Sequence, residues 1–210
     1  MLYRGHIGII KMKHLARTYC WWPNIDKDIV DIIKYCAICA KLQPLPKPTF
    51  KSWEEPKQLI IVDAKSKFPI VVDMKNNTTA KYVCDALEQI IDWFGPPQTL
   101  VTDNGPPFNS YEMNKFYDKY AIKHITTPPY HPASNGLAER FVRSFKGGML
   151  KEQQVGQTNK FTAIRNVLRC YRWTPHTSTG LSPANMMLSY SIRTEFDTMK
   201  PDELTKQQQQ

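Results

Sequence analysis

The chain has 210 residues, with 28 Lys and Arg against 19 Asp and Glu, so its formal net charge at pH 7 is +9. Hydrophobic residues (41%) and aromatic residues (11%) suffice for a sizeable core, which excludes a wholly disordered chain. No apolar run approaches the roughly 18 residues of a membrane span, and the first residues lack a secretory apolar segment, so we expect an intracellular protein that is neither secreted nor membrane-bound.

The positive charge is concentrated at the two ends of the chain. Residues 1–50 carry +5, residues 51–135 carry −1 and residues 136–210 carry +5. This distribution indicates a polyanionic partner, although charge alone does not separate nucleic acid from an acidic membrane surface. The five cysteines are odd in number and include the pair Cys36 and Cys39, whose spacing favours a metal site over a disulfide in a reducing compartment.

Residues 1–43 are predicted to form helices separated by a turn. A first apolar stripe at helical spacing consists of Ile9, Met12, Leu15 and Ala16. The Trp-Trp-Pro-Asn sequence at 21–24 ends this helix, and a second stripe consists of Ile29, Ile32 and Ile33. Residues 43–48 contain three prolines and predict a stiff, extended linker, which is the clearest domain boundary in the chain.

After the linker, strand and helix patterns alternate, which is typical of an α/β domain. The predicted strands are 59–63, 68–74, 98–102 and 123–126, and the predicted helices between them are 77–94 and 110–120. Residues 127–136 are predicted to be irregular because they are rich in Pro. A further helix carries Leu137, Phe141, Phe145 and Met149 at i+4 spacing, and another covers 161–172.

Two acidic residues stand where metal ligands are common. Asp103 directly follows a predicted strand, and Glu139 lies in the first turn of a predicted helix, with 35 residues between them. Carboxylates from separate elements can converge on Mg²⁺, and two such ions about 4 Å apart can activate a nucleophile in phosphodiester chemistry. Taken alone, each acid has a simpler explanation, a turn Asp and a first-turn Glu favoured by the helix dipole.

Longer strings around these acids resemble the retroviral-type integrase core of gypsy-class long-terminal-repeat retrotransposons. The strings are LVTDNGPPFNS at 100–110 and PYHPASNGLAER at 129–140, and the 35-residue gap matches that family's Asp-to-Glu spacing. Residues 5–8, 19–26 and 36–39 resemble its N-terminal zinc domain, and residues 171–183 resemble the segment that follows its core. The resemblance therefore covers nearly the whole chain.

The resemblance implies an RNase H-like α/β core preceded by a small helical zinc-binding-like domain. It further implies a triad of acids that holds two Mg²⁺ or Mn²⁺ ions for 3′-end processing and strand transfer of DNA. Asp103 and Glu139 match the second and third acids. DNA is the implied partner and a homo-oligomer the implied assembly, acting in the nucleus or in a cytoplasmic preintegration complex.

Basic residues follow Glu139 along its predicted helix. Arg143 and Lys146 lie at i+4 and i+7 from Glu139, on its face and opposite the apolar stripe, and Arg140 is adjacent in sequence. These three cations suit contacts with DNA phosphates beside the acids. A solvated basic face is the alternative.

The first acid of the triad has no match at its usual place. In the family it lies on the first core strand, but here residues 53–58 pass almost directly into the second strand, so about fifteen residues are missing on this alignment. Three explanations stay open. The core is compromised, or the strand at 59–63 slides into the vacancy and brings Asp63 toward the site, or the gap is a gene-model artefact.

The zinc site is also incomplete. His6, Cys36 and Cys39 match three of the family's four Zn²⁺ ligands, but Tyr3 stands at the first His position. Because structural zinc sites are tetrahedral, we expect a weakened affinity for Zn²⁺. His14 is a conceivable substitute but fits an ordinary surface residue.

Four regions are therefore predicted. These are a zinc-binding-like domain at 1–43, a Pro-rich linker at 44–58, an integrase core at 59–155 and a C-terminal extension at 156–210. The predicted function is integrase-like nucleic-acid binding, with catalysis impaired by the loss of the first Asp. The alternatives are a non-catalytic domesticated DNA-binding protein and a decaying transposon fragment.

Overall fold

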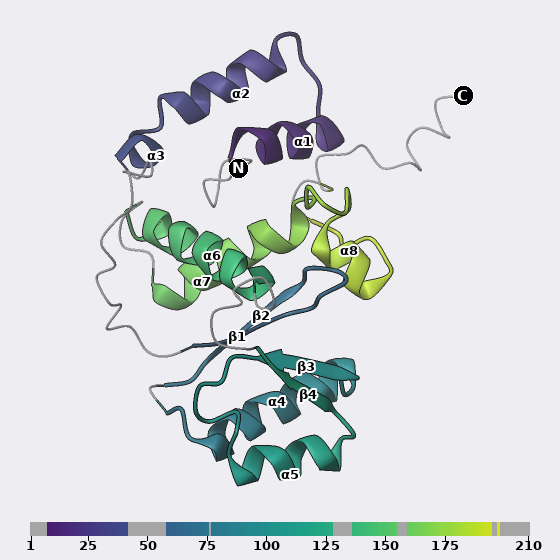
Figure 1. Ribbon diagram of the computed structural model, residues 1–210. Coiled ribbons are helices and arrows are strands. Elements are labelled where there is room, and N and C mark those ends of the chain that lie inside the picture. The colour runs from purple at the N-terminus through teal and green to yellow at the C-terminus, as the bar shows by residue number, and fades with distance from the viewer. Residues whose placement is uncertain are drawn as a thin grey trace. The chain divides into compact units, whose positions relative to one another are not determined.

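The computed structural model describes residues 8–41, 58–75, 77–127, 136–154, 159–194 and 197 (Figure 1). The chain divides into two compact units. The first unit consists of Met1–Thr49, Asp63–Phe68 and Arg143–Gln210, and the second of Phe50–Val62 and Pro69–Val142. Within the described part of the chain, no helix has the length and apolar character needed to cross a membrane. The four regions predicted from the sequence stay predictions.

The N-terminal part of the first unit is helical, as the apolar spacing predicts. It contains α1 (Ile9–Tyr19), α2 (Ile25–Lys34) and the short α3 (Ala37–Lys41), which was not predicted. Asn24 adopts a left-handed conformation (φ 66°) before α2 and turns the chain there. The small core between α1 and α2 consists of Met12, Ala16, Ile25 and Ile29.

The C-terminal part of the first unit packs helices closely together. It contains α7 (Lys160–Trp173), α8 (Pro183–Leu188) and the C-terminal part of α6 (Gly136–Gln154). Asn166 on α7 donates a 2.8 Å hydrogen bond to Glu152 on α6, which satisfies a carboxylate that is only 5% exposed. Of the apolar stripe predicted for α6, Phe141, Phe145 and Met149 are buried and Leu137 is half-buried.

Contacts also join α1 to the C-terminal part of the same unit. The Lys11 ammonium lies 5.2 Å from the centroid of the Tyr171 ring, and the hydroxyl oxygens of Thr194 and Tyr19 lie 3.2 Å apart. Burial lowers the pKa of Lys11 and raises the pKa of the neighbouring Cys170 thiol to about 11. The thiol is therefore protonated at neutral pH.

The second unit is an α/β arrangement with two small sheets. β1 (Gln58–Val62) pairs antiparallel with β2 (Pro69–Asp73), and β3 (Thr99–Thr102) pairs parallel with β4 (Lys123–Thr126). α5 (Tyr111–Lys119) connects the parallel pair, which needs such a crossover, and α4 (Ala80–Phe94) lies between β2 and β3 in the chain. Each of these strands and helices was predicted, with ends that differ by a few residues.

One apolar core holds the two sheets to α4 and α5. Its buried members are Met74, Val83, Ala86, Leu87, Met113, Phe116, Tyr117 and Ile122. Leu59 and Val72 from the antiparallel sheet and Leu100 from the parallel sheet pack against the same core. The two sheets therefore share one core although no strand joins them among the described residues.

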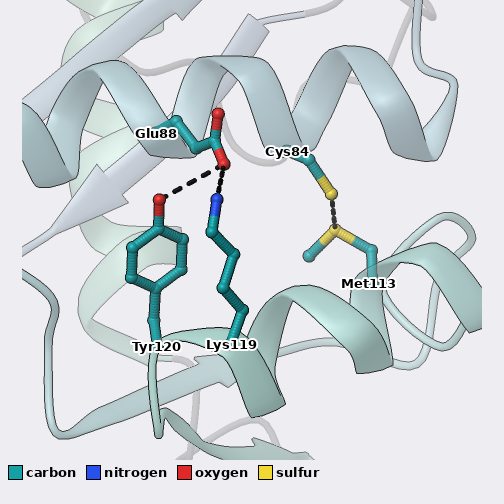
Figure 2. Close-up of polar contacts among 5 residues, drawn as sticks. All are labelled: Cys84, Glu88, Met113, Lys119 and Tyr120. Atoms are coloured by element: carbon teal, nitrogen blue, oxygen red, sulfur yellow. Dashed lines mark hydrogen bonds and ion pairs between the residues drawn. The ribbon is translucent and has the colours of Figure 1, made fainter.

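Polar contacts add to the packing of α4 on α5. Lys119 Nζ lies 2.7 Å from Glu88 Oε1, and the Tyr120 hydroxyl donates to the same oxygen at 3.2 Å (Figure 2). The Cys84 thiol lies 3.4 Å from the Met113 sulfur. These contacts link α4 to α5 beside their shared apolar core.

The division of the sheet bears on the missing first strand. Within the described residues β1 is hydrogen-bonded only to β2, and β3 only to β4, so the strand at 58–62 does not occupy a place beside β3. Residues 42–57, which directly precede β1 and where the sequence lacks the family's first strand, lie outside the described part of the chain.

Candidate functional site

Asp103 lies at the carboxyl end of β3, as predicted. Thr102 before it is buried, whereas Asp103 itself is exposed. The backbone N–H of Gly105 donates to Asp103 Oδ1 at 3.2 Å, and a Cβ at Gly105 would lie 3.1 Å from the same oxygen. The absence of a side chain at Gly105 therefore allows this close approach of the backbone to the carboxylate.

The loop after Asp103 is held to β4 and encloses a shallow groove. Thr127 N–H donates to Thr102 O at 2.9 Å, and Asn104 Nδ2 donates to Thr127 O at 3.3 Å. The groove has a volume of about 310 Å³ and is lined by Asn104, Pro106, Pro107, Asn109 and Ser110. The groove therefore lies on the loop that directly follows Asp103.

Three residues behind Asp103 form contacts that the sequence did not reveal. Thr102 Oγ1 lies 2.8 Å from His124 Nε2, and the His124 ring stacks on Tyr117 with centroids 4.3 Å apart. Burial lowers the pKa of His124 and raises that of Tyr117 to about 12. No signal in the sequence identifies these partners, because Thr102 and His124 are 22 positions apart.

Glu139 lies in the first turn of α6, also as predicted. Its side chain is exposed, and its negative charge is favoured near the helix N-terminus. Arg140 and Arg143 are exposed as well, and Lys146 is half-buried. The basic residues therefore share the accessible surface of α6, away from its buried Phe and Met stripe.

Asp63 has a structural role at the tip of the β1–β2 hairpin. Its Oδ2 accepts two 2.6 Å hydrogen bonds, from the backbone N–H and the hydroxyl of Ser66. Its own backbone N–H donates to Phe68 O at 3.0 Å. One carboxylate oxygen is thus already engaged in closing the turn.

No three of the predicted acids come together in the described residues. No group of three His, Cys, Asp or Glu side chains that could hold a metal ion occurs in the described ranges. Among the described residues, Asp26 and Glu88 form ion pairs with Lys or Arg side chains, whereas Asp103 and Glu139 form none.

The cysteine pair lies at the start of α3. Cys36 precedes the helix, Cys39 lies within it, and both thiols are half-buried. Cys36 O accepts from Ala40 N–H at 2.9 Å, so the pair is held in one helical turn. His6 and Tyr3 lie outside the described residues, and His14 is exposed on α1. The two thiolates suit Zn²⁺, but two ligands do not complete a site.

Two known domain families match consecutive parts of the chain. Residues 2–44 match the integrase zinc binding domain, and residues 45–132 match the integrase core domain. The chain combines an integrase zinc-binding domain with an integrase core domain. The integrase core match ends before α6, so Glu139 lies beyond it.

Curated relatives of this integrase-domain chain include polyproteins. An uncharacterized protein of Caenorhabditis elegans is 31% identical over 220 residues, which cover 95% of this chain and 17% of the relative. The Gag-Pol polyprotein of walleye dermal sarcoma virus is 29% identical over 197 residues, which cover 83% of this chain and 11% of the relative. The chain thus spans less than a fifth of these relatives.

Solved structures show the same fold. The magnesium-bound integrase catalytic core of HTLV-2 is 26% identical with a TM-score of 0.53, over 62% of this chain and 83% of that chain. A chain of the simian T-cell lymphotropic virus intasome, in a complex with a PP2A regulatory subunit, is 18% identical with a TM-score of 0.66, over 95% of this chain and 74% of that chain. The predicted fold, an RNase H-like α/β core after a small zinc-binding integrase domain, is confirmed.

Proposed function

We propose that this integrase-domain chain binds DNA and derives from an enzyme of metal-dependent DNA integration, with impaired catalysis. The observation that carries the proposal is the placement of Asp103 and Glu139. Both are exposed on the second unit, at the end of β3 and the start of α6, and neither is paired with a cation in the described residues. The gypsy class and nuclear action are part of the proposal.

Exposed carboxylates such as those of Asp103 and Glu139 have the chemistry that binds a divalent metal. Asp103 would bind Mg²⁺ or Mn²⁺ through its carboxylate, which Gly105 N–H orients, and Glu139 would bind from α6. The metal supplies Lewis-acid stabilisation of a phosphodiester under attack. The magnesium in the HTLV-2 integrase core supports this choice of metal.

We propose that catalysis is impaired because Asp63 serves the hairpin turn rather than the metal. Its Oδ2 takes both hydrogen bonds from Ser66, and no group of three acids that could hold a metal occurs within the described ranges. Two carboxylates position metal less firmly than three. The chain then retains weak metal binding with little or no strand transfer.

The accessible cations of α6 are the proposed contacts with DNA phosphates. Arg140 and Arg143 are exposed, and Lys146 is half-buried one turn further along. The net charge of +5 over residues 136–210 adds to the attraction. The HTLV-2 integrase core, which is 26% identical to this chain, has been solved in a trimeric and a dimeric form, and this makes a homo-oligomer the proposed assembly.

Metal titration separates the roles of the three acids. Mn²⁺ binding is measured as the loss of the electron paramagnetic resonance signal of the free ion. We expect the affinity for Mn²⁺ to be lower in Asp103→Asn and in Glu139→Gln. We expect Asp63→Asn to leave it unchanged and Asp63→Ala to lower stability through the lost turn bonds. Loss of Mn²⁺ binding in Asp63→Asn would instead identify Asp63 as the third ligand.

Activity and DNA binding are measured on the same variants. With Mn²⁺ and oligonucleotide ends, we expect strand transfer to be weak or undetectable, and any activity to disappear in Asp103→Asn. DNA binding should persist in that variant and fall steeply with salt. Arg143→Gln should reduce, by about 1, the slope of the logarithm of the DNA-binding constant against the logarithm of the salt concentration. Lys81 is an exposed charge on α4, and Lys81→Gln should leave this slope unchanged. Strand transfer at the rate of an intact integrase, or DNA binding that ignores salt, would contradict the proposal.

A further inference from the structure

A series of side-chain contacts runs from Thr102, next to Asp103, through His124 to Tyr117. The function proposed above does not use these contacts. Thr102 Oγ1 is 2.9 Å from Asp103 O and 2.8 Å from His124 Nε2. His124 stacks on Tyr117 at an interplanar angle of 26°, and the Tyr117 hydroxyl donates to Phe108 O at 3.3 Å. These contacts therefore reach both the first and the last residue of the loop from Asp103 to Phe108.

The hydrogen atoms of this chain can be assigned by counting donors. The Thr102 hydroxyl has one proton, and Asp103 O can only accept, so the hydroxyl donates to Asp103 O. His124 Nε2 must then carry the proton that it shares with Thr102 Oγ1. Burial lowers the pKa of His124, which favours the neutral ring with its proton on Nε2.

Tyr117 holds the other end of the loop. Its ring is 4% exposed and lies against the imidazole, so it restricts the orientation of His124. Because burial raises the pKa of Tyr117 to about 12, its hydroxyl stays a donor to Phe108 O throughout the neutral range. Tyr117 on α5 thus bonds the backbone at Phe108 directly, whereas His124 on β4 acts on the backbone at Asp103 through the Thr102 hydroxyl.

We propose that His124 and Tyr117 are positioning residues that, through Thr102 and Phe108, hold the Asp103–Phe108 loop so that the Asp103 carboxylate faces its metal. This inference rests on the proposed role of Asp103 as a metal ligand. The backbone of Asp103 is fixed from the Thr102 side, and its carboxylate from the Gly105 side. Neither His124 nor Tyr117 needs to touch metal or DNA.

The test uses the full-length chain with ¹⁵N labelling and reads the Gly105 amide, which donates to Asp103 Oδ1. His124→Phe keeps an aromatic ring but removes the donor, whereas His124→Gln keeps an N–H donor. Thr102→Val keeps the shape but removes the hydroxyl, whereas Thr102→Ser keeps it. Thr174→Val is the matched control, because it removes a hydroxyl that donates to Cys170 O in the first unit.

In metal-free protein, we expect His124→Phe and Thr102→Val each to speed hydrogen exchange of the Gly105 amide about tenfold, the factor given by losing one ordinary hydrogen bond. The same two variants should bind Mn²⁺ about tenfold more weakly. His124→Gln and Thr102→Ser should restore both quantities toward the original values. Thr174→Val should change neither, even if it lowers the unfolding midpoint.

The outcomes separate this inference from the proposed function. Unchanged Gly105 exchange in both His124→Phe and Thr102→Val would overturn the inference, and so would equal Mn²⁺ affinity in all variants. Faster exchange in both variants, together with no Mn²⁺ binding by the original chain, would overturn the metal site and leave the hold on the loop supported. Because Thr102→Val nearly preserves volume, it tests the contact even if His124→Phe does not fold.

Discussion

At the scale of single residues, the exposed pair Glu88 and Lys119 shows how one hydrogen bond changes protonation. The bond from Lys119 lowers the pKa of Glu88, and the same bond raises the pKa of Lys119. Both side chains are exposed, at 41% and 58% of their area, so water and salt screen their attraction. Their effect on stability should therefore be small and should depend on pH.

We predict that the coupling between Glu88 and Lys119 disappears in acid. A carboxylate whose pKa is lower in the folded state stabilises the fold above its unfolded pKa, near 4.5, and this contribution is lost as the pH falls through the folded value. A double-mutant cycle with Glu88→Gln and Lys119→Met, measured by urea unfolding, should show coupling at pH 7 and none well below pH 4.5. Coupling that persists in acid would show that packing, not charge, joins the pair.

A second prediction at this scale concerns the incomplete zinc site. We propose that His6, Cys36 and Cys39 bind Zn²⁺ weakly because Tyr3 supplies no imidazole. Tyr3→His should raise the zinc affinity measured by competition with a chromogenic chelator, and Cys36→Ser should lower it. His14→Gln is the control, because His14 is exposed on α1 and should not contribute. An unchanged affinity in Tyr3→His would contradict the assignment.

At the scale of elements, two adjacent glycines of α6 differ in their surroundings. A Cβ at Gly147 would meet nothing within 4 Å, whereas a Cβ at Gly148 would lie 2.9 Å from Val167 Cγ1 on α7. Alanine favours a helix over glycine by about 1 kcal/mol, but only where its methyl group has room. The close approach of α6 and α7 therefore depends on one of the two glycines.

The two substitutions should change stability in opposite directions. We expect Gly147→Ala to stabilise the protein by about 0.5–1 kcal/mol. We expect Gly148→Ala to destabilise it by about 1–3 kcal/mol through overpacking. Urea unfolding of both variants provides the measurement, and Gly148→Ala combined with Val167→Ala tests the mechanism, since the second change removes the methyl groups in the way. Equal effects of the two single changes would refute the close contact.

Elements were predictable where local pattern and packing agree. The α6 stripe follows from its i+4 spacing, because the apolar face of this helix is decided by its own sequence. The short helices α3 and α8 escaped prediction. α8 has a good start, with Ser182 as its cap and Pro183 in its first turn, but six residues hold too few apolar positions to show a period.

At the scale of the whole molecule, two separate cores lead to a prediction about cooperativity. Met113 is fully buried in the core of the second unit, and Ile29 is 1% exposed in the small core of the first. Met113→Ala and Ile29→Ala should each cost about 2–5 kcal/mol. Because the cores lie in different units, each substitution should mainly raise hydrogen exchange within its own unit. A uniform rise over both units would mean that they unfold as one.

The candidate site was predictable in its acids but not in their support. Asp103 and Glu139 stand on the elements that the sequence predicts, because a strand end and a helix start are local features. Their role as ligands stays a prediction. Thr102, His124 and Tyr117 became visible only in the fold, since their contacts bring β3, β4 and α5 together. The separation of the two sheets depends on long-range pairing and was equally hidden.

The first unit is assembled from separate stretches of the chain, and this affects how the chain folds during synthesis. The first unit draws on three stretches, Met1–Thr49, Asp63–Phe68 and Arg143–Gln210, whereas the second lies almost entirely between them. On a ribosome, the second unit can be complete while α7 and α8 are still being made. The first unit must wait for its last stretch and close a long loop to receive it, which costs chain entropy. Its N-terminal helices therefore emerge early and acquire their final neighbours last.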